Sequence, residues 1–122
     1  MKPSGAALAI ALAAAVVLAA AAPTRGRAEE PPRVVRIVAK RFSYTPSEIT
    51  VKKGEPVVLE LVSEDRLHGF NVPAFRIRTD VRPHDVTRVP LTPDTAGTFP
   101  FHCDVFCGDG HEDMTGTLVV TE

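Results

Sequence analysis

The chain has 122 residues, with 14 lysine and arginine residues against 15 aspartate and glutamate residues and a formal net charge of −1. This balance provides no strongly basic surface, so nucleic acid is excluded as a partner. With 44% hydrophobic residues, two cysteines and no tryptophan, the composition is that of one small globular domain.

The N-terminal segment has the pattern of an export signal. Lys2 precedes an uncharged, alanine-rich run from Ala6 to Ala22, and Gly26-Arg27-Ala28 is a small-residue cleavage site. We expect residues 1–28 to be a signal peptide. An uncleaved anchor is the alternative, although the run is short of the ~20 residues that span a bilayer. Cleavage would leave 11 basic and 15 acidic residues, a net charge of −4, in a periplasmic or other extracytoplasmic protein.

The first half of the remaining chain alternates apolar and polar residues with the period of β-strands. Residues 29–33, with two prolines, are expected to be a linker, and residues 34–122 the folded domain. Alternation predicts a strand over residues 34–40, and it resumes at Ile49 and Val51 after a break near Pro46. The clearest strand has three inward-facing residues, which are Val57, Leu59 and Leu61.

The second half continues this pattern. Strands are predicted near residues 76–81 and 85–91, at 98–103 and at 115–121. The strand at 98–103 would place Cys103 on one face and His102 on the other, and His84 is expected in an exposed turn. No segment after residue 28 has a useful helical period. Some seven short strands in under 100 residues predict an all-β protein, a Greek-key β-sandwich.

Both cysteines lie in one loop between two predicted strands, in the pattern Cys103-x3-Cys107-x3-His111-x2-Met114. Thiolate, imidazole and thioether are the ligands that copper and zinc prefer. Zinc sites usually place a second ligand pair a dozen or more residues away, and a mononuclear blue-copper site needs only one cysteine. A disulfide between Cys103 and Cys107 is the alternative, because export permits one.

This loop resembles that of the CuA domains of cytochrome oxidase subunit two and of nitrous-oxide reductase. The pattern in that family is a distant histidine followed by Cys-x3-Cys-x3-His-x2-Met. The likeness extends over about residues 34–122. It includes three further segments, which are Pro46-x2-Ile49-x-Val51-x2-Gly54, His68-Gly69-Phe70-Asn71-Val72-Pro73 and Gly116-Thr117-Leu118-Val119-Val120. The resemblance implies a cupredoxin-like fold.

The resemblance also implies a ligand set for two copper ions. Cys103 and Cys107 would bridge both ions, and His68 and His111 would each bind one. Met114 and the backbone carbonyl of Val105 would be weak outer ligands. Many oxidase members have a glutamate at the position of Val105, a change that a carbonyl ligand tolerates.

The implied function is the transfer of single electrons. Alone, such a domain is a carrier; in a haem-copper oxidase it would be the subunit that receives electrons. The implied partners are a c-type cytochrome or other redox protein, haem-copper oxidase subunits, and a copper chaperone for assembly, with membrane contact only through an uncleaved N-terminal segment. The alternative function is periplasmic copper binding and delivery.

The loop also carries four acidic residues and no basic one: Asp104, Asp109, Glu112 and Asp113. They form either a solvated rim or a docking surface for a basic cytochrome c or a copper donor, because complementary charge steers transient encounters.

Overall fold

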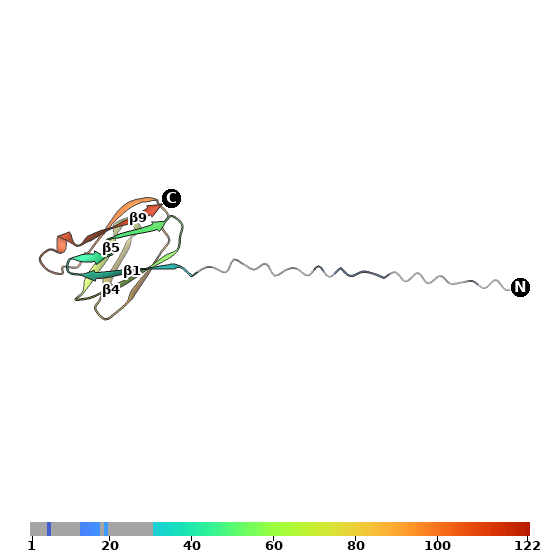
Figure 1. The fold of residues 1–122 in the computed structure, drawn as a ribbon, viewed down its shortest axis with the longest axis horizontal. Coiled ribbons are helices and arrows are strands. Elements are labelled where there is room, and N and C mark those ends of the chain that lie inside the picture. The colour runs from blue at the N-terminus through green and yellow to red at the C-terminus, as the bar shows by residue number, and fades with distance from the viewer. Residues whose placement is uncertain (1–4, 6–12, 18, 20–30) are drawn as a thin grey trace.

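The folded part of the chain is a sandwich of two β-sheets (Figure 1). Residues 5, 13–17, 19 and 31–122 are described by a computed structural model. The strands are β1 (Arg33–Lys40), β2 (Ser43–Thr45), β3 (Glu48–Lys52), β4 (Val57–Ser63), β5 (His68–Val72), β6 (Ile77–Val81), β7 (Thr87–Leu91), β8 (Gly97–His102) and β9 (Thr115–Thr121). Two single-turn 3-10 helices, η1 (Pro73–Phe75) and η2 (His111–Asp113), complete the described elements.

The sheets have the orders β2-β1-β4-β7 and β3-β9-β8-β5-β6. Two pairings, β1 with β4 and β3 with β9, are parallel and join strands distant in sequence. The loop between β8 and β9, which contains η2, lies at the end of the sandwich away from the C-terminus (Figure 1). The predicted all-β sandwich is confirmed.

The described chain has nine strands where about seven were expected. The two extra strands are β2 and β5, and β5 covers the stretch around His68. β2 is only three residues long and pairs with β1 through Tyr44 opposite Ala39. The region before Pro46 was expected to break the strand pattern, because three residues are too few to establish an alternation. β1 begins at Arg33, the last residue of the expected linker.

The predicted signal segment, residues 1–28, falls mostly outside the described residues. Within the part of the chain that is described, no helix is long and apolar enough to cross a membrane.

The core between the sheets follows the predicted alternation. Val57, Leu59 and Leu61 of β4 are at most 1% exposed. Near the β8–β9 loop, three aromatic side chains pack together, with ring centroids 5.9 Å apart for Tyr44 and Phe70 and 5.1 Å apart for Tyr44 and Phe101. Burial of each such ring contributes about 1.5–3 kcal/mol. These three buried rings belong to the same core cluster as Cys103 and Cys107.

Candidate metal centre

The ligand-type side chains converge at one end of the sandwich. His68 is the first residue of β5, Cys103 follows β8 directly, and Met114 directly precedes β9. The ligand atoms of His68, Cys103 and Cys107 all lie within 4.8 Å of one another. These residues and Met114 are at most 3% exposed. The metal-binding side chains thus come together at one buried point. They come from the start of β5, the end of β8 and the loop between β8 and β9.

The remaining predicted residues contact the two sulfur atoms. The Sγ of Cys103 donates to the backbone carbonyl of Val105 at 3.1 Å. The Sγ of Cys107 lies 3.5 Å from Nδ1 of His111 and 3.8 Å from Sδ of Met114. Both thiols are free. The structure therefore brings all six residues of the predicted ligand set into one cluster of contacts.

His68 is oriented by a carboxylate that the sequence analysis did not identify. Its Nε2 lies 2.6 Å from Oδ1 of Asp65. Asp65 also accepts the backbone N–H groups of Arg41, at 2.8 Å, and of Arg66, at 2.7 Å. Burial raises the pKa of Asp65, but these backbone hydrogen bonds and the one from His68 outweigh it and lower the pKa to about 2. The carboxylate thus stays ionised and holds the proton on Nε2.

The other ring nitrogen of His68, Nδ1, is suited to act as a metal ligand. With Nε2 bound to Asp65, Nδ1 carries the lone pair, and it is buried without a hydrogen-bond partner among the described residues. A buried polar atom left unpaired costs free energy, and a metal ion would supply the missing partner. A carboxylate on the opposite nitrogen is the usual support of a metal-binding histidine.

The burial of the thiols has an electrostatic consequence. Burial, with a further contribution from nearby Cys103, raises the pKa of Cys107 to about 11. In the absence of a cation the thiol therefore keeps its proton. Only the ionised sulfur is a good metal ligand, so binding of a metal must release this proton.

The loop rests on the turn between β1 and β2. Gly108 and Gly110 have φ values of 133° and 105°, in the region that disfavours other residues. A Cβ atom on Gly110 would lie 3.0 Å from the ring of Phe42, and one on Gly108 would lie 3.2 Å from it. The neighbouring Arg41 N–H binds Asp65, so one turn supports both the loop and the carboxylate behind His68.

Other predicted features are placed differently. His102 is half-buried and lies outside the His/Cys/Cys cluster found among the described residues. His84 is exposed, with φ of 68°. Asp104, one of the four acids expected in a solvated rim or a docking surface, instead forms an ion pair with Arg78 at 2.7 Å. Arg78 belongs to β6, so this pairing depends on strand register that the local sequence does not encode.

We expect Asp65→Ala to weaken metal retention. Without this carboxylate, the ring of His68 would no longer be fixed in orientation and its proton would no longer be held on Nε2. Losing such a partner typically lowers metal affinity by about 10–100-fold. Affinity is measured by competition with a copper chelator. Asp65→Asn is the matched control. Asparagine has the same size and keeps an oxygen acceptor, so this variant should lose less copper affinity than Asp65→Ala. Equal affinity of the alanine variant and the wild type would contradict this role.

The comparisons with known proteins agree with this fold. The sequence profile of the cupredoxin-like domain matches residues 8–120. The chain therefore belongs to the cupredoxin-like family, and it is a copper-binding domain related to cytochrome c oxidase subunit 2.

Two proteins are similar to this chain in sequence, and one solved structure is similar to it in fold. Cytochrome c oxidase subunit 2 of Thermus thermophilus is 38% identical over 88 residues, covering 72% of this chain and 65% of that protein. Nitrous-oxide reductase of Ralstonia nicotianae is 33% identical over 90 residues, covering 70% of this chain and 14% of that protein. The crystal structure of the periplasmic domain of cytochrome oxidase subunit II from Bradyrhizobium japonicum superposes with a TM-score of 0.70 at 18% identity, covering 76% and 86% of the two chains. The chain thus spans less than two thirds of the curated relatives it matches here.

Proposed function

We propose that this chain is an electron-transfer domain with a binuclear CuA-type centre. Cys103 and Cys107 bridge two copper ions, with His68 on one ion and His111 on the other. Met114 and the carbonyl of Val105 are the weak outer ligands. The proposal goes beyond copper binding in general, because it specifies two copper ions per chain and the residues that bind them.

One observation carries the proposal: two free, buried thiols share a cluster with a histidine whose inner nitrogen has no partner among the described residues. A mononuclear blue-copper site would leave one of the thiols without a role. The contacts of Cys107 with both His111 and Met114 support its assignment as a bridge to a second ion.

The protein's contribution is rigidity around the ligands. Two coppers that share two thiolates spread one electron over both metals, so bond lengths change little with oxidation state. Asp65 fixes the ring of His68, and the N–H of Gly69 donates to Sγ of Cys103 at 3.3 Å. The carbonyl of the same glycine accepts a hydrogen bond from the buried Tyr44 hydroxyl at 2.7 Å. Such hydrogen bonds to ligands tune a metal site.

The proposed setting is the periplasm or another extracytoplasmic space, reached through the N-terminal signal. There the domain takes electrons from a c-type cytochrome or another redox protein, alone or as the electron-receiving subunit of a haem-copper oxidase. A copper chaperone supplies the metal during assembly. The similarity to cytochrome c oxidase subunit 2 supports this setting.

Reconstitution with copper tests the proposal. Residues 29–122 are loaded, copper per chain is counted, and optical and electron paramagnetic spectra are recorded. Two coppers, a purple colour and a signal shared over both nuclei are the expected result. One loosely held, exchangeable copper would instead indicate copper delivery, and no copper would indicate a structural or thiol-disulfide protein.

The acidic residues of the loop provide a prediction about the electron donor. Because Asp104 is paired with Arg78, the docking surface reduces to Asp109, Glu112 and Asp113. The same loop also presents Phe106, which is 68% exposed. We expect neutralising these three to Asn, Gln and Asn to slow electron uptake from a basic cytochrome c about tenfold at low salt.

Stopped-flow rates at several ionic strengths measure this effect. The control is Glu48→Gln, an equally exposed acid on β3. An unchanged rate and salt dependence in the triple variant would contradict the docking surface.

A further inference from the structure

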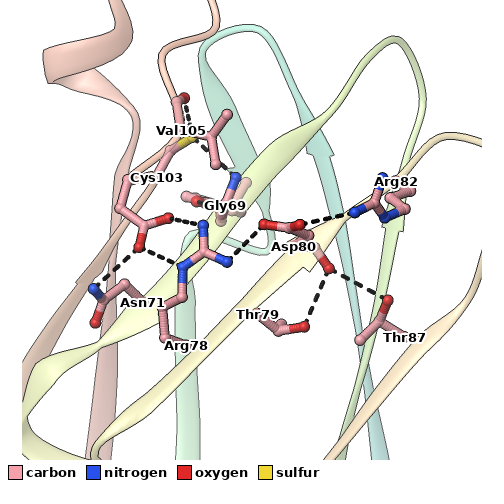
Figure 2. A network of polar contacts seen from close by, with 11 residues as sticks. Gly69, Asn71, Arg78, Thr79, Asp80, Arg82, Thr87, Cys103 and Val105 are labelled. Atoms are coloured by element: carbon pink, nitrogen blue, oxygen red, sulfur yellow. Dashed lines mark hydrogen bonds and ion pairs between the residues drawn. The ribbon is translucent and has the colours of Figure 1, made fainter.

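The ion pair of Arg78 and Asp104 lies beside the metal cluster without belonging to it. Asp104 follows Cys103 directly in the chain. Its carboxylate accepts two hydrogen bonds from Arg78, from Nε at 2.7 Å and from Nη2 at 3.0 Å (Figure 2). Nδ2 of Asn71 donates to the same carboxylate at 3.3 Å. A two-pronged contact between arginine and carboxylate fixes geometry as well as charge.

The arginine is itself held by the sheet. Asn71 and Arg78 are opposite each other in the pairing of β5 with β6. Nη1 of Arg78 donates to Asp80 at 2.6 Å, and Arg82 donates to the other oxygen of Asp80 at 3.0 Å, so these side chains form a row along β6 (Figure 2). Asp104 is therefore anchored to two paired strands and not to its own loop.

Asp104 also contacts the residue that binds the Cys103 sulfur. A Cβ atom on Gly69 would lie 1.9 Å from Oδ1 and 3.0 Å from the backbone nitrogen of Asp104, so only glycine leaves room for this side chain. The same glycine donates its N–H to Sγ of Cys103 (Figure 2). A shift of the Asp104 backbone would move the peptide that joins it to Cys103 and would alter the contact between this sulfur and Gly69.

We propose that Arg78 and Asp104 are positioning residues that hold Cys103, before any metal arrives, with its sulfur on the Gly69 N–H. The Arg78 side chain is 44% exposed and that of Asp104 is 22% exposed. Ion pairs this exposed contribute little to global stability, so the effect of the pair is local to Cys103.

Hydrogen exchange of the metal-free domain tests this directly. In Arg78→Gln and in Asp104→Asn, the Gly69 amide should exchange about tenfold faster than in the wild type, because its acceptor is no longer held in place. Arg82→Gln is the matched control: it removes a guanidinium bound to the same row, at Asp80, that does not touch Asp104. Its Gly69 amide should keep the wild-type rate, and the thermal midpoints of all variants should agree.

Copper affinity supplies the second readout, and it rests on the proposed function. Competition with a Cu(I) chelator should give about tenfold weaker binding for Arg78→Gln. Arg78→Lys should recover only part of the loss, because one ammonium group cannot reproduce the two-pronged contact.

The two readouts separate the two proposals. If the wild type binds no copper through its thiols, the proposed function fails, while the Gly69 exchange rate still decides the role of the pair. The positioning role is overturned if Arg78→Gln leaves Gly69 exchange at the wild-type rate, or if Arg82→Gln accelerates it equally.

Discussion

Replacing Cys107 by serine is expected to reduce bound copper from two ions per chain to one at most. It should also abolish any electron paramagnetic signal shared between two nuclei. A serine hydroxyl neither ionises near neutral pH nor offers a soft sulfur, so the bridge is lost. The loss also removes the contacts of this sulfur with His111 and Met114. Metal analysis and electron paramagnetic spectra of the loaded variant measure both effects.

His102→Asn is the control for this experiment. His102 is adjacent to Cys103 and half-buried but lies outside the cluster, so its replacement should leave stoichiometry and spectrum unchanged. Survival of the shared signal in the serine variant would refute the assignment of Cys107 as a bridge.

Gly116→Ala is expected to be the most destabilising of the conservative changes near the site. A Cβ atom there would lie 2.1 Å from the ring of Phe101 and 2.7 Å from the carbonyl oxygen of Ser47. The second neighbour is backbone and cannot turn away. Forcing a methyl group into such a core costs about 1–3 kcal/mol of unfolding free energy.

Urea unfolding of the metal-free domain measures this cost. Thr115→Ala, an exposed change on the same strand, should remain within about 0.5 kcal/mol of the wild type. A Gly116→Ala variant as stable as the wild type would show that the ring of Phe101 and the backbone at Ser47 can both move to admit the methyl group.

The strand faces could be predicted because one side of each strand packs into the core. Val57, Leu59 and Leu61 alternate with partly exposed neighbours, and the period of two is visible in the sequence alone. The short β2 could not be predicted, since its place is set by Tyr44, whose ring fills the core and whose hydroxyl reaches Gly69. That contact spans 25 positions of the chain.

The candidate site was predictable where its residues are close in sequence. The spacing from Cys103 to Met114 indicates soft-metal chemistry, whereas His68 came from a resemblance to known domains. Asp65 and Arg78 were missed for a different reason. Asp65 lies three residues before His68, but an acid in a loop has many uses, and Arg78 meets Asp104 only through the register of β6.

The parallel pairing of β3 with β9 has a consequence for how the domain folds. These strands are joined across the whole body of the chain, and Thr121 of β9 donates to the carbonyl of Val51 in β3, 70 residues earlier. Folds dominated by contacts of such separation form slowly, because a long loop must close before its contacts stabilise it. We expect that, until β9 docks, Met114 is not in place and the two cysteines, buried in the folded domain, are open to solvent. The thiols are therefore exposed to oxidative damage in the unfolded chain, and the docking of β9 protects them from it.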